Sequence, residues 1–121
     1  MGIAESDGAG PAVDNASNRV ITMVENESDI YTAIHGRRLL KFIYRGRKRV
    51  IEPYAYGVDA GGHPILRAYQ VSGESDSGVP AWKLFRVEEI TELNLVEDTF
   101  EGPRAGYMRN DPTMTKIYCE L

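Results

Sequence analysis

The stretch LLKFIYRGRKRVIEP, residues 39–53, has the pattern of a β-hairpin. Large apolar residues occupy every second position of its first half, the period of two expected where one strand face packs on a core: Leu40, Phe42 and Tyr44. Arg45-Gly46 is the predicted turn, because Gly46 tolerates a positive φ, although this dipeptide does not fix the turn type. We expect the return strand to run from Arg47 to Glu52 and to end at Pro53, because proline has no N–H for a sheet.

The same region concentrates positive charge. Half of the 14 Lys and Arg residues lie within residues 37–49, which contain no acid: Arg37, Arg38, Lys41, Arg45, Arg47, Lys48 and Arg49. One interpretation is a solvated hairpin tip that acidic segments elsewhere neutralise; the other is a polyanion site, in which phosphates take the place of the missing acids. Because the net charge is −4, any polyanion binding must be local.

Before the hairpin, the sequence predicts a tail and one short helix. Residues 1–18 are rich in Gly, Ala, Ser, Asp and Asn, which predicts a disordered tail, whereas residues 19–25 fit either a short strand or a helical turn. Ser28 is a helix cap and Gly36 a helix stop, and the residues between them carry an apolar stripe. We therefore assign residues 1–27 to a disordered tail and linker.

After the hairpin, turn signals separate further short strands. Tyr54 to Val58 reads as an extended piece, and residues 59–62, DAGG, as a turn. Strands are predicted at 64–72, 82–87 and 91–96, with a surface loop at 73–81 and a corner at 88–90. In the first of these strands, Arg67 and Tyr69 share one face, while Leu66, Ala68 and Gln70 share the other. The pattern predicts a mainly β domain over residues 28–100, a small barrel and not a parallel α/β sheet.

The C-terminal residues 101–121 form an extension punctuated by Pro103 and Pro112. Asp111 is a candidate cap for a final short helix holding Met114, Ile117 and Tyr118. We expect this helix to dock on the barrel or on a second copy of the chain.

Composition bounds the class of protein. The 121 residues suffice for one domain with tails, and they contain neither a run of about 20 apolar residues nor a signal-peptide pattern. The single cysteine, Cys119, excludes an internal disulfide and fits a reducing compartment. We expect a cytoplasmic protein without membrane contact.

Catalytic candidates are few. His35 closes the predicted helix and His63 lies in a glycine turn, and neither has a nucleophile in an evident pairing. The serines in residues 73–78 lack the G-x-S-x-G spacing, and Cys119 has no CxxC partner. We expect no enzyme activity, metal or cofactor; hydrolysis by Ser75 or Cys119 is the weakest hypothesis.

Binding is better supported, since cationic and aromatic residues recur across the predicted sheet as they do on nucleic-acid surfaces. Arg49, Arg67, Lys83 and Arg86 are expected to converge on one face flanked by Tyr44, Tyr69 and Trp82; the alternative is that these aromatics belong to the core or its rim. The candidate ligand-binding residues are Tyr44, Arg45, Arg47, Arg49, Arg67, Tyr69, Lys83 and Arg86.

The order and spacing of several motifs between residues 28 and 100 resemble the WYL domain. They are Tyr44-Arg45-Gly46, Arg49-Val50-Ile51-Glu52-Pro53, Gly57, Gly62, Leu66, Ala68-Tyr69 and Phe85-Arg86 before Ile90. The resemblance implies a strongly bent Sm-like or SH3-like β-barrel. It also implies a ligand-sensing role, as in bacterial transcription regulators and accessory proteins of prokaryotic defence systems, with nucleic acid or nucleotides as ligands.

The sequence departs from this family at functional positions. The Trp-Tyr-Leu tripeptide that gives the family its name corresponds to Pro64, Ile65 and Leu66 in this sequence. Lys83 stands where an arginine is usual, and Glu89 stands where the family has a basic residue. The residues before the domain are too few for a helix-turn-helix.

The leading hypothesis is a stand-alone regulatory module that binds a nucleotide or short single-stranded nucleic acid and acts on a protein partner. The alternative is a protein-interaction domain that dimerises or meets an acidic partner and binds no small ligand.

Overall fold

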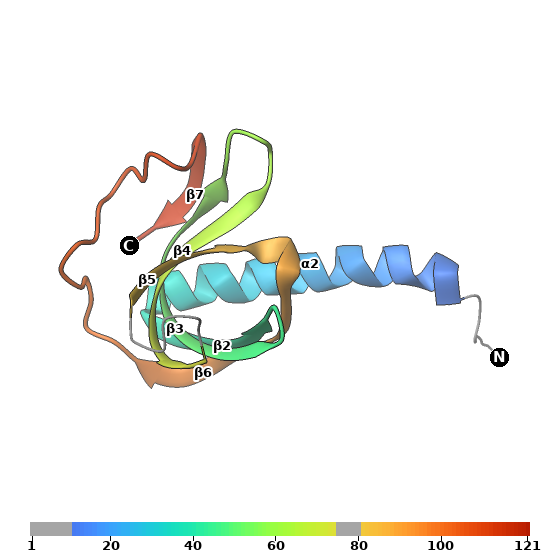
Figure 1. Cartoon of the computed structure of the whole chain (residues 1–121), viewed down its shortest axis with the longest axis horizontal. Helices are drawn as coiled ribbons and strands as arrows, with labels where there is room; N and C mark the ends of the chain where they lie inside the picture. Colours follow the sequence, from blue (N-terminus) through green and yellow to red (C-terminus); the bar gives the residue numbers. More distant parts are fainter. Residues whose placement is uncertain (1–10, 75–80) are drawn as a thin grey trace.

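A computed structural model of the chain describes residues 11–74 and 81–121, with side chains from Val20 onward. A long helix precedes a set of antiparallel strands (Figure 1), which confirms the predicted mainly β class. The elements are α2 (Pro11–Gly36), β2 (Arg38–Tyr44), β3 (Arg47–Val58), β4 (Pro64–Gly73), β5 (Ala81–Arg86), the 3-10 turn η1 (Val87–Glu89), β6 (Ile90–Thr99) and β7 (Lys116–Glu120). None of the helices in these ranges is long and apolar enough to cross a membrane.

The sheet is organised around β3. Its strand order is β5-β4-β3-β2-β6, and β7 also pairs with β3. Along one edge of β3, β2 pairs as far as Ile51 and β7 pairs from Ala55 onward; β4 follows the other edge. In the described part of the chain β5 and β6 do not pair, so the curved sheet is not closed into a barrel.

The hairpin forms as predicted, with Tyr44 opposite Arg47. Arg45 and Gly46 both have positive φ, at 52° and 75°, which is the requirement of a type I′ turn. The predicted end at Pro53 is wrong, because β3 continues to Val58. Pro53 lies between the segments paired with β2 and β7 and beside a register shift toward β4, where a missing N–H is tolerated.

Helix α2 ends at Gly36 as predicted but begins at Pro11, so the start at Ser28 is wrong. Residues 11–27, expected as tail and linker, are helical, and residues 1–10 lie outside the described ranges. The physical reason is cooperativity: the predicted stripe of Ile30, Ala33 and Ile34 is fully buried and anchors the helix, and extending an existing helix costs little. Proline is also favoured in a first turn.

Other parts of the chain pack against both faces of the sheet, the outer one only in part. The inner face carries Leu40, Phe42 and Phe85 and packs against α2. On the outer face, the fully buried Tyr54 contacts Phe100 and Tyr107 of the C-terminal extension, at ring-centroid distances of 5.4 and 4.9 Å. The extension is therefore part of the core.

The predicted C-terminal helix is wrong, because residues 116–120 form strand β7. Asp111 caps a turn and not a helix: its Oδ1 accepts a hydrogen bond from the Thr113 amide at 2.9 Å. The chain then pairs with the edge of β3 that β2 leaves open, placing Ile117 opposite Gly57. The unpaired N–H and C=O groups of an open sheet edge favour strand formation in a segment that lies beside them, and the local sequence does not show this effect.

Candidate functional site

The hairpin turn and β5 enclose a cavity of about 390 Å³, which we call the hairpin cavity. Five of the eight predicted ligand-binding residues line it: Tyr44, Arg45, Arg47, Arg49 and Lys83. The remaining lining residues are Leu84 and Phe85, so the described wall contains four cations and no acid. This size and composition fit a small anionic ligand.

Arg49 forms the buried part of the cavity, with 8% of its surface exposed. Its guanidinium donates hydrogen bonds to Gln70 Oε1 at 3.1 Å and to the Tyr44 carbonyl at 3.3 Å. It also lies 5.6 Å from the Tyr44 ring centroid and 5.7 Å from that of Phe85. Held on several sides, Arg49 is a fixed positive charge between two aromatic rings.

The other cations lie nearer the solvent. Arg47 and Lys83 are partly exposed. Arg45 Nε donates to Glu89 Oε1 at 2.9 Å, and this hydrogen bond holds the pKa of Glu89 below its usual value. Glu89, the departure from the WYL pattern, thus places a negative charge beside the cavity and partly offsets Arg45.

The prediction that four basic residues converge on one face is wrong for Arg67 and Arg86. In the β4–β5 register, Arg67 lies opposite Leu84 and Ala68 opposite Lys83. Because successive side chains alternate between faces, Arg67 and Lys83 lie on opposite faces of the sheet. The exposed side chain of Arg86 is not in the cavity wall, although its backbone N–H donates to the Tyr44 hydroxyl at 3.1 Å.

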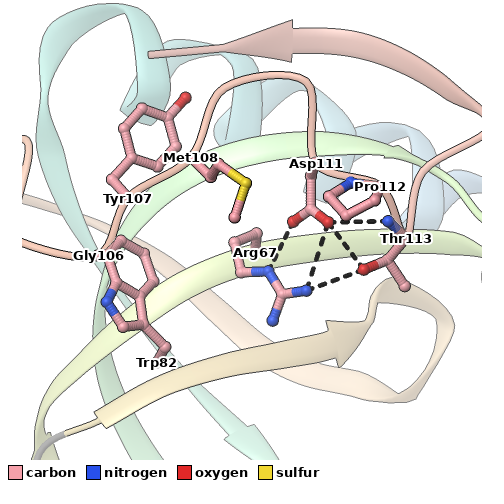
Figure 2. A pocket seen from close by; sticks show the side chains of 8 residues that line it. All are labelled: Arg67, Trp82, Gly106, Tyr107, Met108, Asp111, Pro112 and Thr113. Carbon is pink, nitrogen blue, oxygen red and sulfur yellow. Dashed lines mark hydrogen bonds and ion pairs between the residues drawn. The ribbon is translucent and has the colours of Figure 1, made fainter.

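Arg67 instead lines a second, outer cavity of about 290 Å³ under the C-terminal extension, here the C-terminal cavity. Figure 2 shows Arg67 bonded to Asp111 and Thr113 on one wall, with Trp82, Tyr107 and Met108 on the other. Arg67 Nε lies 2.7 Å from Asp111 Oδ2. The Arg104 guanidinium lies over Tyr69, 4.3 Å from its ring centroid, so the C-terminal extension occupies the position that a ligand would need at Tyr69.

The Arg67–Asp111 pair predicts a pH-dependent stability. Burial acts to raise the pKa of Asp111, but hydrogen bonds from Arg67 and Thr113 outweigh it and hold the pKa below the usual 3.8. A lowered folded-state pKa stabilises the fold above the unfolded value and loses that effect as pH falls through the folded value. We expect Asp111→Asn to cost about 1–2 kcal/mol in urea unfolding at pH 7 and progressively less as the pH falls below 3.8 toward 2. An equal cost at both ends of this pH range would contradict this role.

Three residues of the site were not among the predicted ligand-binding residues: Leu84, Phe85 and Gln70. Phe85 forms part of the cavity wall, and its ring centroid lies 4.8 Å from that of Tyr44. Gln70, 2% exposed, orients Arg49. The sequence signal for Gln70 was its polar amide on the face of the predicted strand that otherwise carries the apolar Leu66 and Ala68.

The surroundings of the catalytic candidates that the structure describes fit structural roles. His35 Nδ1 lies 2.8 Å from the Tyr31 carbonyl one turn earlier, and His63 Nδ1 lies 3.2 Å from Glu88 Oε1. Burial raises the pKa of Cys119 to about 11, so its thiol is protonated at neutral pH. Ser75 lies outside the described residues.

No protein-family model, curated protein or solved structure matches this chain. The geometry of the hairpin cavity is therefore the basis for inferring function. Its defining property is positive charge gathered around aromatic rings.

Proposed function

We propose that this chain is a WYL-like regulatory module that binds a nucleotide or a short single-stranded nucleic acid in the hairpin cavity. The proposal includes a strongly bent sheet of the Sm-like or SH3-like kind, and a protein partner that responds to the bound state. The observation that carries it is the gathering of Arg45, Arg47, Arg49 and Lys83 around one cavity of about 390 Å³.

Phosphate contacts and base stacking involve different parts of the proposed ligand and different residues of the cavity. Arg47 and Lys83 are accessible enough to reach phosphate oxygens, and the planar guanidinium of Arg47 suits bidentate contact. Tyr44 and Phe85 flank the fixed Arg49 but are only 6% and 1% exposed, so base stacking falls to the exposed guanidinium of Arg45. The volume falls within the range of about 300–1,000 Å³ typical of small-molecule pockets.

The proposal predicts that the double variant Arg47→Ala/Lys83→Ala binds oligonucleotides at least about tenfold more weakly than the wild type. Fluorescence anisotropy with labelled single-stranded DNA, single-stranded RNA and duplex measures this at two salt concentrations. For single strands, the log–log salt slope should also fall by about 0.7 for each phosphate that the variant no longer neutralises.

A matched control is Lys116→Ala, which removes one exposed positive charge from β7. We expect its affinity to equal that of the wild type. Loss of affinity to the same extent in Lys116→Ala would indicate diffuse attraction and not a site. Absence of binding by the wild type at low salt would overturn the proposal in favour of the protein-interaction alternative.

A further inference from the structure

The N-terminal half of α2 carries an apolar patch that the rest of the described chain does not cover. Val20, Ile21 and Val24 are 64%, 55% and 60% exposed, and we call them the α2 patch. Because residues four apart on a helix are neighbours, these side chains lie together. Among the α2 side chains that the structure describes, from Val20 onward, the first that packs against the core is Met23, and Figure 1 shows the helix projecting beyond the sheet at this end.

A second unused surface lies on the outer face of the hairpin. It is a groove of about 460 Å³, here the lysine groove, lined by residues of β2, β3, β6 and the end of β4. Partly buried Ile43 and Val50 form its apolar floor, and exposed Lys41 and Lys48 flank them. Its wall contains three basic residues and one acid, Glu92.

These two surfaces are complementary in polarity and charge. Residues 20–36 contain three acids and no Lys or Arg. Glu25 is exposed and lies one turn after Ile21, so an acid flanks the α2 patch. An apolar helical stripe with an acidic flank matches an apolar floor with lysines at its sides.

The α2 patch and the lysine groove of the same chain cannot contact each other. Ile30 and Ala33, fully buried, fix α2 against the inner face of the sheet, whereas Lys41 and Lys48 project from the outer face. The α2 patch of one chain therefore cannot reach the lysine groove of the same chain.

We infer that the occupant of the lysine groove is the α2 patch of a second copy of this chain. A single helix-in-groove contact is small, but a twofold axis supplies it twice and closes the assembly as a dimer. The groove and the hairpin cavity share Arg49, but Lys41, Lys48, Ile43 and Val50 line the groove alone, so variants at these residues test the dimer without changing the cavity wall.

Sedimentation equilibrium of the full chain over a concentration series tests the inference. We expect a monomer–dimer equilibrium that Val24→Ser shifts to monomer and that Lys48→Glu weakens roughly tenfold. Glu25→Lys introduced into the Lys48→Glu chain should restore the dimer, since it exchanges the two charges. Lys116→Glu, with the same charge change on exposed β7, should leave the dimer unchanged.

Circular dichroism of each variant checks that these surface changes leave the fold intact. A wild type that remains monomeric at all concentrations would overturn the inference. So would a dimer that resists both Val24→Ser and Lys48→Glu, or assembly beyond the dimer, which would mean that the interface does not close.

Discussion

Replacing Gly57 by alanine is expected to detach β7 from the sheet and to cost about 3 kcal/mol of unfolding free energy. A Cβ at this position would collide with the Lys116 carbonyl oxygen, and would lie 2.9 Å from Met114 Sδ and 3.1 Å from Ile117 Cα. Two of these three atoms are backbone, so a side-chain rotation cannot relieve the collision. Urea unfolding measures the loss of stability, and faster hydrogen exchange at Ile117 and Cys119 would locate it in β7.

Gly36→Ala is the matched control for this substitution. The nearest atoms to an added Cβ there belong to the flexible Arg38 side chain, at 3.6 Å, an ordinary van der Waals distance. We expect its stability to match or slightly exceed that of the wild type. Similar destabilisation in both variants would mean that the close approach of β3 and β7 has no special role.

Arg49→Ala is expected to destabilise the chain by about 3 kcal/mol, in addition to weakening ligand binding. The change removes two hydrogen bonds and leaves Gln70 Oε1, on a side chain only 2% exposed, without the donor it has now. It also removes the guanidinium that packs beside the Tyr44 and Phe85 rings. Urea unfolding of the two proteins checks the size of the effect.

The sequence predicted Arg49 as a ligand-binding residue, and its burial predicts that it also supports the fold. Arg109→Ala provides the comparison, because the Arg109 side chain is 67% exposed and its Nη2 lies 3.2 Å from Glu120 Oε2. Its stability should change by less than about 0.5 kcal/mol. If Arg49→Ala were equally harmless, the buried guanidinium would not be a structural element of the cavity.

Local patterns predicted the elements whose structure is set locally. The hairpin follows from alternation and a glycine turn, the end of α2 from Gly36, and the turn after β3 from Asp59, whose Oδ1 accepts bonds from the amides of Gly61 and His63. Five candidate ligand residues came together because they lie on or beside this one hairpin, or on the inner face of β5.

The failures have non-local causes. Strand β7 depends on a free edge of β3, which is distant in the sequence, and the separation of Arg67 from Lys83 depends on the β4–β5 register. Glu52, buried at 5% exposure, accepts hydrogen bonds from Arg104 Nε at 2.8 Å and from the Tyr54 hydroxyl at 2.9 Å. This network fixes the C-terminal extension on the outer face, and no pattern within the extension indicates it.

The most direct test of the central claim is an amide chemical-shift titration of the labelled chain with a short oligothymidine at low salt. Ligand binding in the hairpin cavity predicts that the largest shifts occur at Tyr44, Arg45, Arg47, Lys83 and Phe85. Largest shifts at Trp82 and Tyr107 on the outer face, or no shifts at all, would contradict the claim.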